Sequence, residues 1–111
     1  MITVTWQCDP KGKPCGFTME GHAGYAEEGS DIVCAAVSAL AQTALLGLLH
    51  YVPQDVSYEM DEGFLSVHIR NSGAEQTVIL QTMKLGLDQI AAQYREYMVL
   101  HTLTSGGERN V

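Results

Sequence analysis

Apolar and polar residues alternate along the first part of the chain, in the pattern typical of β-strands. Every second residue of ITVTWQ (2–7) is apolar, and the alternation returns in FTME (17–20) after a segment rich in turn formers, residues 9–14. A period of two points successive side chains to opposite faces of a strand, so that one face can be buried. The pattern predicts an N-terminal β-hairpin that runs to Gly21.

A long apolar segment follows, and it repeats with the period of a helix. Residues 32–52 contain no Asp, Glu, Lys or Arg, and their apolar side chains recur at helical spacing. About 20 such residues are enough to span a bilayer. Polar residues such as Gln42 and His50 interrupt the segment, however, and no Lys or Arg anchors flank it. We predict a helix buried on most of its circumference, ended by Pro53, and no contact with a membrane.

The second half of the chain repeats this arrangement. The alternating segments 56–60 and 65–69 flank the turn sequence DEG (61–63), which predicts a second hairpin. From 74 to 94 apolar residues recur every three or four positions, which predicts a second helix, and residues 98–103 predict a last strand. One face of the second helix would then carry Ile79, Met83, Leu87, Ile90 and Tyr94.

The predicted order of elements is β-β-α-β-β-α-β, which corresponds to a single α+β domain with one mixed sheet and two helices. Residues 1–103 make up this domain, and residues 104–111 form a polar C-terminal tail. A length of 111 residues is enough for one hydrophobic core. The composition, with 46% hydrophobic and 17% charged residues, is that of a globular protein.

Charge and cysteine content narrow the class of protein. The net charge is −7 and there are only six Lys and Arg residues, which argues against a nucleic-acid partner and suits a basic one. The first residues lack the basic and apolar regions of a signal peptide, and three cysteines are an odd number. We therefore expect a cytoplasmic protein in which Cys8 and Cys15 are free residues at strand ends.

Reactive side chains occur together between the second strand and the first helix. His22 precedes Cys34 by 12 positions, across a loop that contains Gly24 and Gly29 and is preceded by Gly21. A cysteine nucleophile needs a base within hydrogen-bond reach, and glycines allow a loop to fold back or to close over a substrate. We interpret Cys34 as a candidate nucleophile, His22 as its base, and the three glycines as a flexible loop.

The start of the first helix supplies the rest of the predicted site. Ser30 or Asp31 can cap this helix, which puts Cys34 in the first turn. There the positive end of the helix dipole favours the thiolate, and unpaired N–H groups can hold an oxyanion. Asp31 can also orient His22, and Ser38, one turn after Cys34, can either position the thiol or bond back to the backbone. The sequence leaves both alternatives open.

Simpler interpretations exist for each of these residues. A single cysteine on an apolar helix is usually a small buried side chain, and a single histidine in a loop is usually ordinary. The remaining histidines, His50, His68 and His101, show no paired spacing of the kind that metal ligands have. We expect neither a metal nor another cofactor.

Two segments together resemble a known signature. The sequences GHA (21–23) and GSDIVCAAVS (29–38) resemble the motif of the ribosomal-processing cysteine proteases, the bacterial Prp family. The similarity continues in MITV (1–4), GFLSVHIR (63–70) and LQTM (80–83), so it covers the chain except for the polar tail. The sequence Asp-Ile-Val-Cys-Ala with an upstream Gly-His is far more specific for one family than an isolated Cys and His would be.

The resemblance implies a Cys–His endopeptidase of small α+β fold, usually a homodimer. Its substrate would be the N-terminal extension of a large-subunit ribosomal protein. By matching motif positions, the resemblance implies that Cys34 is the nucleophile and His22 the base, with Asp31 and Ser38 in support. It also implies cleavage after apolar and aromatic residues, and hence an apolar groove near the loop.

Two other classes of protein would use the same residues differently. A non-catalytic ribosomal-protein-binding or ribosome-assembly factor would use the loop only for recognition. A redox or acyl-transfer enzyme would use the activated thiol on another substrate. Cleavage of a peptide that spans the extension separates the protease from both.

Overall fold

The computed structural model describes residues 1–21 and 30–104, apart from the side chains of Ser30 and Asp31. The predicted order of elements is confirmed. β5 includes Thr104, the first residue of the predicted tail, and residues 105–111 lie outside the described part of the chain. In chain order the elements are β1 (Ile2–Cys8), β2 (Pro14–Glu20), α1 (Ser30–Tyr51), a 3-10 turn (Pro53–Asp55), β3 (Val56–Asp61), β4 (Phe64–Ile69), α2 (Ala74–Gln93) and β5 (Met98–Thr104).

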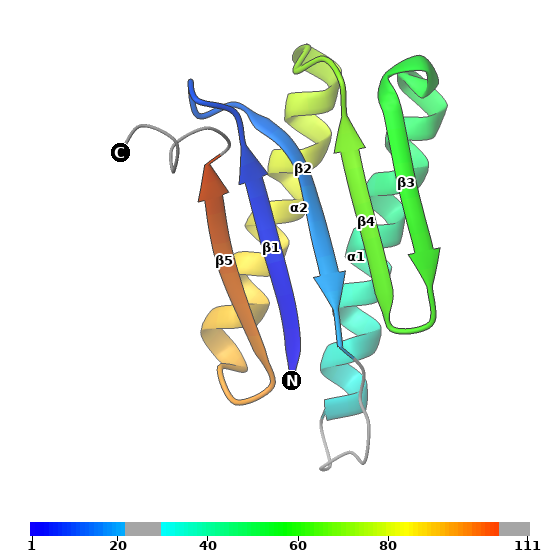
Figure 1. The fold of residues 1–111 in the computed structure, drawn as a ribbon. Coiled ribbons are helices and arrows are strands. Elements are labelled where there is room, and N and C mark those ends of the chain that lie inside the picture. Colours follow the sequence, from blue (N-terminus) through cyan, green and yellow to red (C-terminus); the bar gives the residue numbers. More distant parts are fainter. Residues whose placement is uncertain (22–29, 105–111) are drawn as a thin grey trace.

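The five strands form one mixed sheet in the order β3-β4-β2-β1-β5 (Figure 1). Both predicted hairpins are present, because β1 pairs with β2 and β3 pairs with β4 in antiparallel fashion. The alternation pattern did not predict how the hairpins join, which is through antiparallel pairing of β2 with β4. It also did not predict that β5 lies parallel to β1. The result places β3 at one edge of the sheet and β5 at the other.

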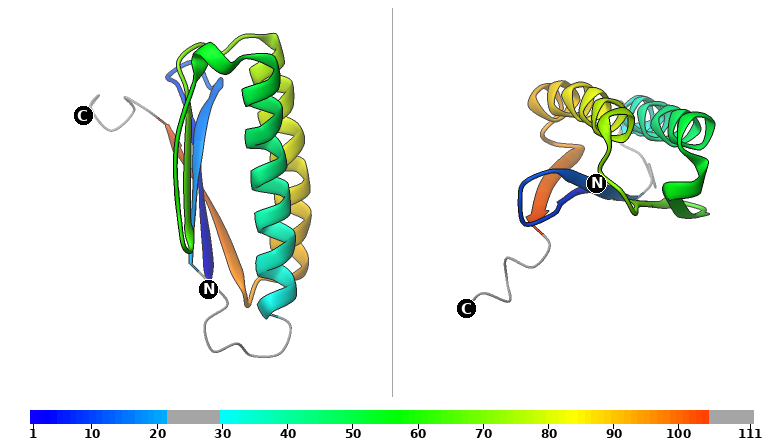
Figure 2. Two further views of the ribbon diagram at one scale, coloured as in Figure 1. Left: turned by 90° about the vertical axis from the view of Figure 1, so that its right-hand side faces the viewer. Right: turned by 90° about the horizontal axis from the view of Figure 1, so that it is seen from above.

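Both helices pack on one face of the sheet, which gives a two-layer domain (Figure 2). Val4 and Trp6 of β1 point into the core between the layers, as the alternation predicts. The other face of the sheet carries polar side chains, and there the hydroxyls of Thr18 and Ser66 lie 3.3 Å apart beside His68. A sheet covered on one face only keeps the alternation of apolar and polar residues that made the strands recognisable.

α1 is less enclosed than the sequence predicts. The segment Ile32–Tyr51 is long and apolar enough to cross a membrane, with a mean hydropathy of 2.1, but only 33% of it is buried inside the domain. Val37 and Leu48 face the sheet and are fully buried, whereas Ile32 and Leu46 are exposed on the outer side. The expectation of burial on most of the circumference is therefore wrong, because the sheet and α2 cover only two sides of the helix.

The buried line of α2 is shifted from the predicted one. Leu80, which the prediction left out, is fully buried, whereas Tyr94, which it included, is exposed. Ile79 points to α1 instead of the sheet, and its methyl groups approach Gly47. A helix beside a second helix has two apolar directions, one to the sheet and one to its neighbour, and periodicity alone does not separate them. The residues buried in the structure are Gln76, Leu80, Met83 and Leu87.

Candidate active site

Cys34 is the fifth residue of α1, at the border of the hydrophobic core. Its neighbours Val33 and Val37 are buried beneath the sheet, while Cys34 itself is half-buried. The first turn of the helix, with its unpaired backbone N–H groups and the positive end of the dipole, immediately precedes the thiol. Cys34 therefore combines a fixed position with access from solvent, which a nucleophile requires.

The helix begins earlier than the predicted cap implies. Ser30 and Asp31 are already the first two residues of α1, so the position before the helix belongs to the loop. An acidic residue in the first turn is favourable because its charge opposes the dipole. The side chain of Asp31 lies outside the described part of the structure, and so do His22, Gly24 and Gly29. The pairing of the imidazole with the Cys34 thiol consequently stays a prediction.

Ser38 lies one turn after Cys34 and is half-buried on the same side of α1. This side is opposite to the one that faces α2, because Leu40, Ala44 and Gly47 line the groove between the two helices. At about 100° per residue, Cys34 and Ser38 lie on one side of the helix face that packs on the sheet, and the groove residues lie on the other. Both side chains thus lie on the flank of α1 that is turned away from α2. Figure 1 shows that β4 and the edge strand β3 are on this side of the helix.

The loop of the candidate site starts from a fixed point. β2 ends and α1 begins at the same end of the sheet, where the β3–β4 turn also lies (Figure 1). Gly21 donates its backbone N–H to the Gly63 carbonyl at 3.0 Å and has a φ of +114°, a region that favours glycine. A Cβ at this position would lie 2.3 Å from the Met1 carbonyl oxygen. The residue before His22 is therefore held between Met1 and the β3–β4 turn, a contact that the sequence did not reveal.

Replacing Gly21 with alanine is expected to destabilise the domain by about 3 kcal/mol, since backbone strain and a backbone clash coincide there. The same change would displace the start of the loop and lower cleavage activity. Urea unfolding followed by circular dichroism measures the first effect, and a peptide assay measures the second. Gly12→Ala is the matched control, because Gly12 also has a positive φ, +85°, but nothing lies within 4 Å of its added Cβ. That control should cost only about 1 kcal/mol, and equal losses for the two variants would contradict the steric role of Gly21.

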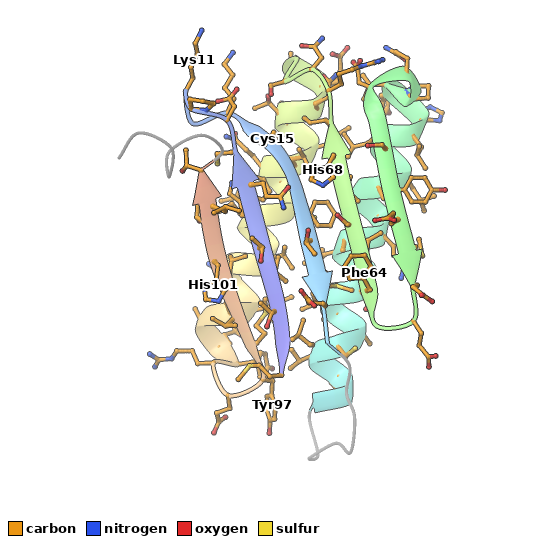
Figure 3. The ribbon with its side chains drawn as sticks, in the orientation of Figure 1. Lys11, Cys15, Phe64, His68, Tyr97 and His101 are labelled. Atoms are coloured by element: carbon orange, nitrogen blue, oxygen red, sulfur yellow. The ribbon has the colours of Figure 1, made fainter. Side chains whose placement is uncertain are left out.

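Carboxylates surround the start of the loop. Glu20 precedes Gly21, and Asp61 and Glu62 precede Gly63, so three exposed acidic side chains flank the hydrogen bond between the two glycines. The exposed Lys11 belongs to the β1–β2 turn at the opposite end of the sheet (Figure 3). The three carboxylates beside the start of the loop would attract a basic polypeptide.

The two other cysteines lie toward the far end of the sheet from the loop, where Cys15 is labelled in Figure 3. Both are free, as predicted, and Cys8 is buried. Burial raises the pKa of the Cys15 thiol, and the nearby Cys8 and Asp9 add to this effect. A raised pKa keeps the Cys15 thiol protonated at neutral pH, which makes it a poor nucleophile. Within residues 1–21 and 30–104, no three His, Cys, Asp or Glu side chains gather in a way that could hold a metal ion.

Comparison with known proteins points in the same direction as the motif. The family model described as cysteine protease Prp matches residues 1–99. The ribosomal processing cysteine protease Prp of Staphylococcus aureus is 37% identical over 107 residues, which cover 91% of this chain and 98% of that protein.

Solved structures of the S. aureus protease are similar as well. One is in complex with a covalently linked product peptide and gives a TM-score of 0.82 at 30% identity. Another is in complex with a substrate peptide and gives a TM-score of 0.86 at 29% identity. Each comparison covers 93% of this chain and 100% of the S. aureus chain, so the similarity extends over the whole described domain.

Proposed function

Since this chain belongs to the cysteine protease Prp family and is therefore a cysteine-type peptidase, we propose that it removes the N-terminal extension of a large-subunit ribosomal protein. In this proposal Cys34 is the nucleophile and His22 is the base. The observation that carries it is the position of Cys34, half-buried just after the first turn of α1, at the end of the sheet where the loop with His22 starts.

The proposed reaction is acyl transfer through a thioester. His22 takes the proton of the Cys34 thiol, and the resulting thiolate attacks the carbonyl carbon of the scissile bond. The backbone N–H groups of the first turn of α1 stabilise the oxyanion. His22 gives its proton to the leaving amine as the C–N bond breaks, which leaves the N-terminal product bound to Cys34. Water then attacks the thioester and passes a proton to His22, and the C–S bond breaks to release the acid. Asp31 and Ser38 support the orientation of His22 and Cys34.

Two observations support a ribosomal-protein substrate. The relative from S. aureus is named a ribosomal processing cysteine protease, and its structures contain substrate and product peptides. In this chain, Glu20, Asp61 and Glu62 place negative charge beside the start of the loop, where they would attract a basic ribosomal protein.

The direct test is incubation of the protein with a full-length ribosomal protein precursor that carries an N-terminal extension. Mass spectrometry should show a single cut that releases the extension and leaves the mature chain intact. A basic ribosomal protein without an extension is the control and should remain uncut. An uncut precursor, or equal degradation of both proteins, would refute the proposed substrate.

A cytoplasmic homodimer is part of the same proposal. Ribosomal proteins are made in the cytoplasm, so the processing enzyme is expected there too. The outer side of the two helices carries an apolar groove of about 310 Å³, lined by Leu40 and Gly47 of α1 and Val78 of α2 among others. The exposed Leu46 also belongs to α1. Burying such a surface between two copies would be favourable. Sedimentation equilibrium tests this, since a dimer has twice the chain mass of 12.1 kDa.

A further inference from the structure

The edge strand β3 exposes two large apolar side chains on the face of the sheet that the helices cover elsewhere. Met60 pairs with Leu65 and Tyr58 pairs with Val67 across the β3–β4 ladder, so all four point to the helical side. Leu65 and Val67 are 2% and 0% exposed, whereas Met60 and Tyr58 are 51% and 48% exposed. Burial therefore ends abruptly between the two strands, and the alternation that identified β3 as a strand wrongly suggests that Met60 and Tyr58 belong to the core.

The inclination of α1 explains this exposure. In Figure 1 the first half of α1 lies behind β2 and β4, and only its last turns reach β3. Val56, at the start of β3, accordingly packs against the core, while Tyr58 and Met60 follow where the helix has moved away. We call these two side chains the β3 strip. The strip runs toward the end of the sheet at which α1 begins.

Cys34 and the β3 strip lie on the same side of the molecule. Cys34 and Ser38 occupy the flank of α1 that is turned away from α2, since Leu40, Ala44 and Gly47 fill the other flank. α2 covers the β1 and β5 side of the sheet, so the free flank of α1 looks over β4 and β3 (Figures 1 and 2). No other described element covers this side.

From this arrangement we infer that the β3 strip binds the peptide substrate, through apolar side chains of the peptide close to the scissile bond. The inference rests on the proposed function, in which that bond is held at Cys34. A peptide that lies along the free flank of α1 would pass directly over Tyr58 and Met60. Its apolar side chains would complete the burial that stops at Leu65 and Val67.

The chemistry of the strip fits a peptide occupant. An aromatic ring and a flexible thioether form an adaptable apolar surface that accepts side chains of different shape. The alternate residues of the strand, such as Ser57 and Glu59, point to the other face and are exposed and polar. Asp61 and Glu62 follow the strip directly and would meet basic residues of the same peptide. A peptide that follows β3 would therefore contact the apolar side chains of the strip and then the negative charges of Asp61 and Glu62.

Peptide binding to the Cys34→Ala variant tests the inference without any dependence on cleavage. The probe is a fluorescently labelled peptide that spans the ribosomal-protein extension and its cleavage site, and anisotropy gives its Kd. A second peptide has the apolar residues nearest the cleavage site replaced by serine. In the Cys34→Ala background, Tyr58→Ser together with Met60→Ser should weaken binding of the first peptide about tenfold, the size typical of a lost apolar contact.

The two peptides and the two proteins, Cys34→Ala with and without the β3 strip, form a double-mutant cycle. The serine peptide should bind more weakly to Cys34→Ala than the parent peptide does, and this difference should shrink to less than about threefold once the β3 strip is removed. Leu103→Ser is the matched control, because Leu103 is 52% exposed on β5, the opposite edge strand. It should leave both Kd values unchanged.

The outcomes separate the inference from the proposed function. Undiminished binding to the variant without the strip, an equal loss with Leu103→Ser, or no binding to Cys34→Ala at all would overturn the inference. A parent protein that leaves the precursor uncut, while the cycle shows the expected coupling, would instead refute the proposed function and support the strip as a peptide-binding surface.

Discussion

Replacing Cys34 with alanine is expected to reduce peptide cleavage by at least about 1,000-fold, to the detection limit of the assay. No other group can form the thioester in the proposed mechanism, so the loss should appear in kcat and in kcat/KM alike. The fold should persist, because Cys34 is half-buried at the border of the core and the substitution removes a single sulfur atom. A coupled chromatographic and mass-spectrometric assay measures cleavage, and thermal unfolding monitors the fold.

Cys15→Ala is the matched control for this experiment. Cys15 is also a half-buried free cysteine, but it lies near the start of β2, at the far end of the sheet, and its pKa is raised by burial. Its replacement should leave cleavage within about twofold of the parent. Cleavage by Cys34→Ala at the parental rate, with an unchanged unfolding temperature, would remove Cys34 from the mechanism and leave the family motif without a nucleophile in this chain.

Replacing His22 with alanine is expected to lower kcat/KM by about 100- to 10,000-fold, the range that a general acid–base group contributes. The pH dependence should change as well. A base must be unprotonated to accept a proton, so the parental rate should rise with pH as the imidazole of His22 loses its proton. The His22→Ala variant should lose that rise. Initial rates over a pH series measure both effects.

Two other histidines serve as controls for His22. His68 and His101 are exposed on the strands β4 and β5, and their replacement by alanine should change neither the rate nor its pH profile. A His22→Ala variant that keeps the parental pH profile would show that another group provides the base. A loss of the same size with His68→Ala would show that the effect is not specific to His22 and would contradict the proposed pair of His22 and Cys34.

Much of the fold could be predicted from the sequence because local patterns specify local structure. The alternation in residues 2–7 and 17–20 identified a hairpin, and the DEG turn at residues 61–63 identified another. The shift from Ile79 to Leu80 in the buried line of α2 shows where this approach fails. Periodicity reports that a side chain is apolar, but it does not report whether the side chain meets a sheet, a neighbouring helix or solvent.

The same distinction applies to the candidate site, of which one part could be predicted from the sequence and another could not. The motif around Cys34 and His22 could be found from the sequence alone, because the residues of a motif are close together along the chain. The role of Gly21 could not, since it depends on the carbonyls of Met1, just before β1, and of Gly63, in the β3–β4 turn. Contacts between residues distant in sequence arise only when the strands pair.

The sequence by itself determined the α+β class, the order of the elements, the protease family and the candidate dyad of Cys34 and His22. These properties are written in short segments whose periodicity and motif residues do not need the rest of the chain. Only the tertiary structure decided the strand order, the uncovered side of α1 and the exposure of Tyr58 and Met60. The physical reason is that burial depends on which element covers which, and the inclination of one helix across the sheet leaves β3 open beside the flank that carries Cys34.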